Sequence, residues 1–311
     1  MLASDAVESK IILPCGLQPK VDGVRSLTAL GPLTGRSLKQ HRNAYVNRFF
    51  NRPEYEFLDG EMAAQDERHP ELCRLTGSAL SRKDGEPFVL WHVFDYLHPD
   101  VVGRPYIHRY EMLKAHIADM QSRGLAGHLR LMPMVICNTL EEVLYWDAKW
   151  LAEGYEGSIK RDLNGAHKQG RSTVREGGLL RIKRFLDFEF RITGVTEGEA
   201  NENEATLNEL GQTNRSTHQE NMVPNGLVGT LQGVVIADVC DPQTGAVLLR
   251  KDQEVTVAAG RMSHDDRRMY FEDQGSIIGQ IGKAKFFPKG IKDKPRFPTF
   301  QCLRFDEDMS D

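Results

Sequence analysis

The chain has 311 residues, enough for one large domain and a smaller one, each with its own core. Its 40 lysines and arginines stand against 44 aspartates and glutamates, so overall charge neither favours nor excludes a nucleic-acid partner. The five cysteines lie far apart, which supports neither a disulfide framework nor a zinc site. Neither a signal peptide nor an apolar run of about 18 residues is found. We therefore expect an intracellular protein that is not secreted and has no membrane partner.

In the first half of the chain, short β-like runs alternate with helical runs. Residues 24–30, 56–64 and 88–97 predict strands, and the last has apolar residues on both faces, as a buried strand does. Residues 109–123 and 139–154 predict helices, because apolar side chains recur at helical spacing. The second helix opens on a Thr-x-x-Glu capping box.

The second half begins with a polar stretch. Residues 197–225 start with five glutamates and no basic residue, and then become rich in Asn, Thr, Ser and Gln. This composition predicts a long acidic loop or insertion outside the core. The runs at 226–239, 244–250 and 253–260 are separated by turn signals and predict a small all-β barrel.

The sequence KVDGVR at residues 20–25 has the parts of a covalent nucleotidyl site. A lysine amine attacks an α-phosphate only when it is neutral, so Lys20 needs a packed site with nearby cations that lower its pKa. Asp22 can orient the amine, and Arg25 can reach a phosphate. By itself, the motif is equally explained as a turn with solvated charges.

Two further motifs offer carboxylates for a metal. FLDGE at 57–61 places Glu61 on a strand, where it suits a ribose hydroxyl or hydrated magnesium. EGSIKR at 156–161 presents Glu156 beside two cations. Hard oxygen ligands and phosphate chemistry favour magnesium, since no cluster of softer ligands occurs. A strand-edge acid and a solvated charge run are the plain structural alternatives.

An aromatic ring and a cationic strand complete this series. Phe94 in VFDY offers a face for a purine, although an aromatic at strand spacing is more often core. Arg181 and Lys183 alternate onto one face of a short strand, so both can meet the same phosphates. A half-exposed strand edge would look identical.

Positive charge is concentrated in one stretch near the C-terminus, with a single aspartate opposing it. Such a cluster can neutralise several DNA phosphates, while solubility alone is the alternative. Its members are Lys283, Lys285, Lys289, Lys292, Lys294 and Arg296.

Taken in order, KVDGVR, FLDGE, VFDY, EGSIKR and LRIK resemble the motifs of the covalent nucleotidyltransferases, which include DNA ligases, RNA ligases and mRNA capping enzymes. Order and spacing most resemble the ATP-dependent DNA ligases, especially the short enzymes of tailed bacteriophages. The stretch from 226 resembles the opening of the ligase oligonucleotide-binding (OB) barrel, and RFPTF at 296–300 resembles its closing strand. The resemblance implies an α+β fold, with an adenylation domain of antiparallel sheets flanked by helices at 1–188 and an all-β OB-fold at 189–311.

The resemblance also implies residue roles. Lys20 is the nucleophile that carries AMP, and Glu61 and Glu156 are the metal ligands. The implied ATP-binding residues are Gln18, Lys20, Asp22, Arg25, Glu61, Phe94, Arg181 and Lys183. The implied DNA contacts are Arg36 in TGRS, Arg161, Arg171 and the basic residues of 283–296. Two motifs depart from the family. TGRS stands at 34–37 where the family usually has Ser-Arg followed shortly by Gly, and Arg36 is the best match. Arg304 matches a basic position, but Glu307 stands where a lysine often follows, which leaves open the cation for the departing pyrophosphate.

The implied function is sealing of 5′-phosphate/3′-hydroxyl nicks in duplex DNA, in replication, repair or recombination, by a monomer in the cytoplasm of a bacterial or phage-infected cell. ATP is the co-substrate, magnesium the metal, nicked duplex DNA the partner, and no obligate protein partner is expected. An RNA ligase and a non-catalytic DNA-end-binding protein on a ligase scaffold are the alternatives. The barrel signature argues against the first, and the presence of Lys20, Glu61, Glu156 and Lys183 argues against the second.

Overall fold

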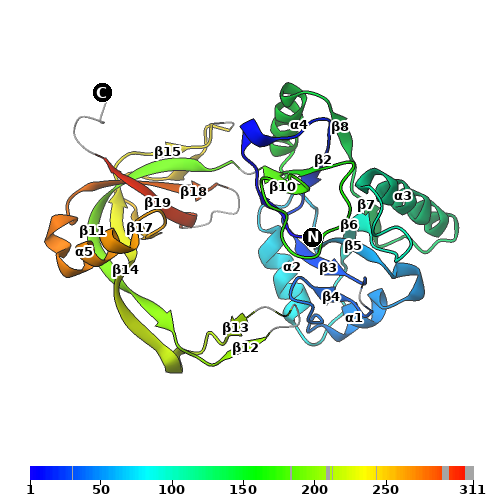
Figure 1. Ribbon diagram of the computed structural model, residues 1–311, viewed down its shortest axis with the longest axis horizontal. Helices are drawn as coiled ribbons and strands as arrows, with labels where there is room; N and C mark the ends of the chain where they lie inside the picture. The colour runs from blue at the N-terminus through cyan, green and yellow to red at the C-terminus, as the bar shows by residue number, and fades with distance from the viewer. Residues whose placement is uncertain are drawn as a thin grey trace. The chain divides into compact units, whose positions relative to one another are not determined.

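The computed structural model describes residues 1–29, 31–182, 184–207, 211, 213–242, 244–288 and 294–304. The chain divides into two compact units, Met1–Lys183 and Arg184–Asp311 (Figure 1). The boundary expected after residue 188 falls inside strand β11, which belongs as a whole to the second unit. The boundary therefore lies a few residues earlier.

The first unit contains two five-stranded sheets, ordered β1-β10-β9-β2-β8 and β4-β3-β5-β6-β7. Most neighbouring strands are antiparallel; β1 with β10 and β6 with β7 are the parallel pairs. The strands are β1 (Ser4–Asp5), β2 (Cys15–Lys20), β3 (Val24–Leu27), β4 (Thr34–Gly35), β5 (Leu58–Ala63), β6 (Leu90–Tyr96), β7 (Leu129–Leu131), β8 (Val135–Cys137), β9 (Gly157–Arg161) and β10 (Leu179–Ile182). The helices are α1 (Ala44–Phe50), α2 (Leu72–Ser81), α3 (Tyr106–Ser122) and α4 (Leu140–Ala152), with single turns η1 (Glu8–Lys10) and η2 (Pro53–Tyr55).

Strand β2 lies inside the first sheet, between β9 and β8. Its side chains alternate between the two faces of the sheet. Cys15 and Leu17 are fully buried and pack in an apolar cluster with Trp150 of α4. The alternate positions, Gln18 and Lys20, therefore face the other side, where they line a cavity.

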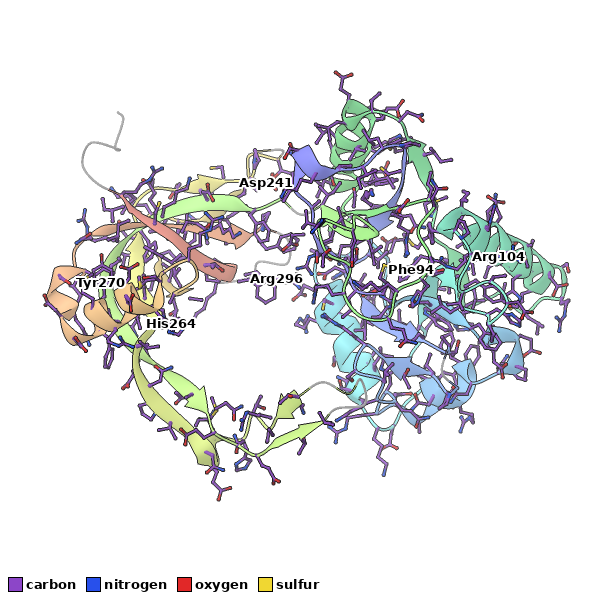
Figure 2. All side chains as sticks on the ribbon, viewed as in Figure 1. Phe94, Arg104, Asp241, His264, Tyr270 and Arg296 are labelled. Carbon is purple, nitrogen blue, oxygen red and sulfur yellow. The ribbon has the colours of Figure 1, made fainter. Side chains whose placement is uncertain are left out.

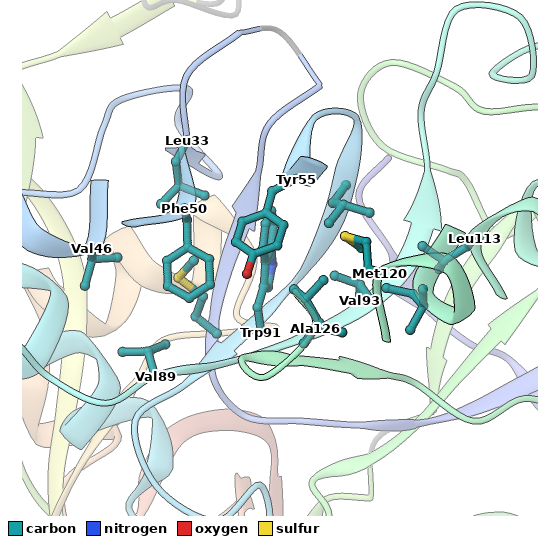
Figure 3. Close-up of a cluster of buried hydrophobic side chains, with 14 of the residues drawn as sticks. Leu33, Val46, Phe50, Tyr55, Val89, Trp91, Val93, Leu113, Met120 and Ala126 are labelled. Atoms are coloured by element: carbon teal, nitrogen blue, oxygen red, sulfur yellow. The ribbon is translucent and has the colours of Figure 1, made fainter. Parts of the chain in front are cut away.

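The second sheet separates a hydrophobic core from the same cavity. One face carries Met62 and Trp91, which join the largest apolar cluster (Figure 3). Phe50 of α1 meets Trp91 edge to face, with ring centroids 5.7 Å apart and ring planes at 86°. Glu61 and Phe94 line the cavity instead. Packing of one face of the sheet against the core thus fixes the position of its polar face.

The two predicted helices are confirmed as α3 and α4. The hydroxyl of Thr139 caps α4 by accepting the backbone N–H of Glu142 at 3.2 Å. The carboxylate of Glu142 accepts from the backbone N–H of Asn138 at 2.6 Å, one residue before the position expected for the capping box. Helices α1, α2 and α5 were not predicted. α1 is only seven residues long, and α5 buries none of its side chains, so neither carries a strong apolar periodicity.

The second unit is built on a closed barrel with strand order β11-β14-β17-β19-β18. Each barrel strand contributes a buried side chain to one core, namely Phe190, Leu231, Val257, Phe300 and Phe286. The strands of the unit are β11 (Leu186–Asn201), β12 (Ala205–Leu207), β13 (Thr213–Arg215), β14 (Met222–Val235), β15 (Val239–Cys240), β16 (Val247–Leu249), β17 (Glu254–Ala258), β18 (Ile281–Phe287) and β19 (Arg296–Arg304). Its helices are η3 (Gln219–Asn221), α5 (His264–Glu272) and η4 (Gln274–Ser276).

The predicted strands correspond, in order, to β3, β5, β6, β14, β16 and β17. The RFPTF sequence opens β19, which pairs with both β18 and β17 and so closes the barrel as expected. None of the helices in the described ranges combines the length and apolar character needed to cross a membrane.

The polar stretch was predicted as a loop or insertion outside the core. Its side chains in β12 and β13 are indeed exposed, but its backbone forms paired strands. β11 and β14 stay paired out to Asn201 and Met222, and β12 pairs with β13 beyond them. Figure 1 shows β11 and β14 as a long ribbon with β12 and β13 at its end. The side chains of β12 and β13 are exposed on both faces. Backbone pairing without a buried face leaves no apolar alternation, so the sequence pattern of a strand is missing.

Two glycines offer a matched test of this fold. Gly157 has φ +148°, and a Cβ there would lie 2.4 Å from the backbone oxygen of Ile182 on β10. Gly77 lies inside α2, with nothing within 4 Å of an added Cβ. We expect Gly157→Ala to lower the free energy of unfolding by about 1–3 kcal/mol, and Gly77→Ala to raise it by about 0.5–1 kcal/mol. Urea denaturation of both variants measures this; equal effects would contradict the register of β9 and β10.

Candidate active site

The first unit contains a cavity of about 390 Å³. It lies at the meeting of the two sheets, because its lining residues come from β2 and β9 of one and from β3, β5 and β6 of the other. Nine of the residues predicted from the sequence line it: Gln18, Lys20, Arg25, Arg36, Glu61, Phe94, Arg161, Arg171 and Arg181. Residues up to 163 positions apart are thus brought to one site by the pairing of strands.

Lys20 is bound by Glu156 through both backbone and side chain. The backbone N–H of Glu156 donates to the carbonyl oxygen of Lys20 at 3.0 Å, and the Lys20 Nζ forms an ion pair with the Glu156 carboxylate. The antiparallel register of β2 and β9 sets Lys20 opposite Gly157, so it also brings the preceding residue to the amine. The Glu156 side chain is 2 % exposed and that of Lys20 is 22 % exposed. The amine is therefore held at the cavity wall.

The charge state of Lys20 differs from the expectation. Burial lowers the pKa of Lys20, but the carboxylates of Glu156, Glu61 and Asp22 outweigh burial and raise the pKa above its ordinary value. We expected nearby cations that lower this pKa, whereas carboxylates raise it. In the ligand-free protein Lys20 is therefore an ammonium ion, and it becomes a nucleophile only if these negative charges are compensated.

Glu61 and Glu156 are both close enough to Lys20 to raise its pKa, and Glu156 is the one paired with the amine. Burial raises the pKa of Glu61 to about 7, and Lys20 and Arg25 oppose this rise. Among the described residues no group of three or more Asp, Glu, His or Cys is placed to hold a metal. Two carboxylates suit a magnesium ion that keeps water and phosphate ligands, so the donor set fits that ion.

Arg25 and Phe94 lie together on the second sheet. Both Nε and Nη2 of Arg25 donate to the carboxylate of Asp59, which is 1 % exposed. The Arg25 guanidinium lies 4.9 Å from the centroid of the Phe94 ring, and the Arg161 guanidinium lies at the same distance from that centroid. Phe94, labelled in Figure 2, is therefore in contact with cations.

Arg161 was expected at the DNA, but its side chain lies inside the first unit. It is 5 % exposed, donates from Nε to Gln18 at 2.8 Å, and lies 3.5 Å from Asp95. Arg109 binds the same Asp95 through two hydrogen bonds of 2.8 and 3.1 Å. These contacts make Arg161 part of the cavity wall.

Arg171 and Arg181 are held by the first residues of the chain. Arg171 donates to the backbone oxygen of Ala3, and Arg181 pairs with Asp5 of β1. The Arg181 side chain is 32 % exposed and that of Asp5 is 57 % exposed. Such an exposed ion pair contributes little to stability, so a phosphate can exchange with the carboxylate at low cost.

The basic residues of the barrel lie in the second unit. Lys283 and Lys285 share the outward face of β18. Lys283 forms an ion pair of 2.7 Å with Asp187, and Lys285 lies 4.7 Å from the ring centroid of Phe185. Arg296, labelled in Figure 2, begins β19. These cations are accordingly associated with acidic and aromatic neighbours.

Four of the predicted site residues lie outside the described residues, namely Lys183, Lys289, Lys292 and Glu307. Lys294 is exposed, and Arg304 forms an ion pair of 2.8 Å with Glu189 of β11.

Four buried polar residues of the site were not predicted: Asp59, Asp95, Tyr106 and Arg109. Each acts through a partner distant in sequence, so no local motif reveals it. The sequence contains one indication that Arg109 is buried with a partner. Arg109 precedes Leu113 by four residues and therefore lies on the apolar face of α3, where a charge needs a partner.

This arrangement concentrates the groups that nucleotidyl transfer requires. An amine at the end of β2 is paired with the carboxylate of Glu156, and Glu61, several guanidinium groups and an aromatic ring line the same cavity. Cations around a cavity suit a polyphosphate, and a lysine amine in the same cavity is a group of the kind that attacks phosphorus.

The chain was compared with known proteins. No protein-family model matches it. Over 142 residues it is 27% identical to the DNA ligase of African swine fever virus, strain Badajoz 1971 Vero-adapted, and 29% identical to that of the isolate Tick/South Africa/Pretoriuskop Pr4/1996. The matched segment is 46% of this chain and 32% of each relative, so the chain spans about a third of the length of these curated relatives.

Solved structures extend the similarity to nearly the whole chain. The fold is similar to the crystal structure of the Chlorella virus DNA ligase-adenylate, with a TM-score of 0.53, 27% identity, and coverage of 99% of this chain and 98% of that one. It is also similar to a Lig E DNA ligase, with a TM-score of 0.66 and 98% of both chains covered, but at 17% identity this likeness shows the fold alone.

Fold and site thus define a mixed α and β protein, in which a unit with two five-stranded sheets is followed by a unit built on a closed barrel. Within this class, the resemblance to DNA ligases that the motifs indicated is confirmed in both sequence and fold.

Glu61 gives the cavity a measurable pH dependence. Its pKa of about 7 in the folded protein lies above the ordinary 4.5, so between these values the folded protein keeps a proton that the unfolded chain has lost. Stability from this group is therefore complete below pH 4.5 and is lost as the pH rises to 7. We expect Glu61→Gln to gain several degrees in melting temperature relative to wild type on going from pH 5 to pH 8.

Thermal melts without ligand at both pH values test this. Glu111→Gln, on the exposed face of α3, is the control. A difference between Glu61→Gln and wild type that stays constant with pH would show that Glu61 does not titrate in this range.

Proposed function

We propose that the chain is an ATP-dependent DNA ligase that seals 5′-phosphate/3′-hydroxyl nicks in duplex DNA. A lysyl-AMP and an adenylated DNA end are its intermediates, and replication, repair or recombination is its setting. ATP and magnesium are the cofactors, and nicked duplex DNA is the partner. The observation that carries the proposal is the position of Lys20, which is paired with Glu156 and lines a cavity together with Glu61 and several arginines.

Transfer begins when the neutral Nζ of Lys20 attacks the α-phosphorus of ATP. The N–P bond forms as the bond to pyrophosphate breaks, and the amine loses its remaining extra proton. Arg25 and Arg181 lie in the same cavity and offset charge on the phosphates. Phe94 presents its ring to the adenine. The work of these residues is mainly positioning and charge compensation.

Two further exchanges complete sealing. The 5′-phosphate oxygen at the nick attacks the same phosphorus. A DNA-adenylate forms, and Lys20 is released as the leaving group. The 3′-hydroxyl then attacks the 5′-phosphate, and AMP leaves. Arg36 and Arg171 line the cavity and are exposed, which supports a role for them at the DNA end. The cations of the barrel supply the sequence-independent attraction to duplex DNA.

Glu61 and Glu156 would hold magnesium beside Lys20. The ion would supply the positive charge that neutralises phosphate oxygens in phosphoryl chemistry. Compensation of the two carboxylates also removes the main cause of the raised pKa of Lys20, so its proton is lost more readily. Metal binding and activation of the nucleophile are therefore coupled through Glu156.

The proposal is tested with α-labelled ATP, magnesium and nicked duplex DNA. We expect wild type to take up label and pass it into DNA that becomes sealed. Lys20→Ala should lose labelling by on the order of 10³-fold or more, because no other group replaces the nucleophile. Lys114→Ala, which removes an exposed lysine of α3, is the matched control and should label as wild type does.

Other outcomes redirect the assignment. Label that forms on Lys20 but moves only to single-stranded RNA would replace the DNA ligase with an RNA ligase. Tight binding to nicked DNA without labelling would leave a non-catalytic end-binding protein.

A further inference from the structure

Residues 2–5, which we call the strap, run along one wall of the cavity. Within the strap, β1 pairs in parallel with β10 and is the edge strand of the first sheet. Before β1, the backbone N–H of Leu2 donates to the oxygen of Gly170 at 2.7 Å, and the N–H of Ser172 donates to the oxygen of Leu2 at 2.9 Å. Leu2 and Ala3 line the cavity itself.

The strap binds two of the cations that line the cavity. Arg171 donates from Nη1 to the backbone oxygen of Ala3. Arg181 donates from Nε to one carboxylate oxygen of Asp5 and from Nη2 to the other, the second at 3.3 Å. Both arginines line the cavity, whereas Asp5 does not. The edge of the Arg181 guanidinium that could bind a phosphate through two hydrogen bonds is therefore occupied by a carboxylate.

The strap is held mainly by its backbone. The side chains of Leu2, Ala3 and Ser4 are half-buried, and that of Asp5 is 57 % exposed. The next residue, Ala6, packs against the apolar cluster of β2 and α4. Segments with few buried apolar contacts open at a low cost in free energy. The strap can therefore leave its position while the chain stays fixed at Ala6.

Asp5 presents to Arg181 the same kind of group as a substrate phosphate does. Carboxylates and phosphates both bind a guanidinium group through two parallel hydrogen bonds. An exposed pair of one carboxylate and one guanidinium is weak. A triphosphate carries more negative charge and can bind Arg181 and Arg25 together, because both line the one cavity. The triphosphate is thus the stronger of the two competing anions.

We propose that the strap is an internal competitor for the phosphates of the nucleotide. It occupies Arg171 and Arg181 in the ligand-free protein, and a triphosphate displaces it by replacing Asp5 at Arg181. This inference rests on the proposed function, in which Arg181 offsets charge on the phosphates of ATP. A cavity that is open only part of the time binds its ligand with a lower apparent affinity. Removal of the Asp5 charge should therefore tighten nucleotide binding.

The first test measures the rate of Lys20 labelling by α-labelled ATP, over a range of concentrations, in wild type and in Asp5→Asn. This substitution removes the charge and keeps the shape of the side chain. We expect the ATP concentration at half-maximal rate to fall about two- to fivefold, the effect of releasing one exposed ion pair, with the maximal rate unchanged. If Asp5 only positioned Arg181 for the phosphates, this concentration would rise instead.

Asp119→Asn is the matched control. Asp119 lies on α3, is 58 % exposed, and forms an ion pair of 3.1 Å with Arg123. Neither of these residues lines the cavity. The control loses a comparable pair of aspartate and arginine, so it should keep the wild-type dependence on ATP. Melting temperatures of both variants verify that they are folded under the assay conditions.

A second measurement detects displacement of the strap in the wild type. The N–H of Ser172 is bound to the Leu2 oxygen, and Ser172 is 1 % exposed, so its hydrogen exchange reports whether the strap is in place. Pyrophosphate serves as the probe, because it binds phosphate sites without transferring a nucleotide. We expect pyrophosphate to speed exchange at Ser172 and to leave unchanged the N–H of Leu129, which donates to the Ala126 oxygen at 3.0 Å.

Two labelling results would overturn the inference and leave the proposed function standing. One is an unchanged or higher half-maximal ATP concentration in Asp5→Asn, and the other is an equal fall in Asp119→Asn. If ATP fails to label the wild type, the proposed function fails, and the exchange measurement decides on the strap separately. Faster exchange at Ser172 with pyrophosphate would then support the strap as a competitor for anions, and unchanged or slower exchange would overturn it.

Discussion

The ion pair between Lys20 and Glu156 is the interaction on which the site depends. β2 ends at Lys20 and β9 begins at Gly157, and antiparallel pairing sets these residues opposite each other. The register of two strands therefore delivers both the amine and its counter-charge. Loss of one partner from a buried pair costs about 3–5 kcal/mol, because a charge is left without compensation. Lys20 is thus held as an ammonium ion, and another positive charge at the carboxylates is needed to free it.

The arginines follow the same principle. Arg25 is held by Asp59, while Arg161 is held by Gln18 and by Asp95. Partners fix the direction of each guanidinium before any ligand arrives, so little reorganisation is needed when phosphates bind. Buried arginines without such partners would be too costly to keep in the fold. Stability of the first unit and preorganisation of its cavity therefore come from the same contacts.

Much of the site was predictable because its chemistry demands particular side chains within short motifs. Lys20, Glu61 and Phe94 all line one cavity, as KVDGVR, FLDGE and VFDY indicated. The sign of the Lys20 pKa shift was not predictable, since a motif does not give distances to carboxylates 41 and 136 residues away. Asp95 was not predicted, because its partner Arg109 lies on α3 and meets it only when that helix packs against β6. In the fold, the apolar pattern predicted the buried strands. The strands β12 and β13 are exposed on both faces and have no such pattern, so they were predicted only as part of a polar loop or insertion.

The carboxylates around Lys20 hold its amine protonated, and the pKa of that amine can be measured. Competitive isotopic labelling of amines, read by mass spectrometry across pH, gives that pKa in the wild type and in Glu156→Gln. Without divalent cation, the pKa of Lys20 should lie above the ordinary 10.5 in the wild type and should fall in Glu156→Gln, since Glu156 is the largest of the raising charges. A pKa of Lys20 below 10.5 in the metal-free wild type, or one that Glu156→Gln leaves unchanged, would contradict this explanation.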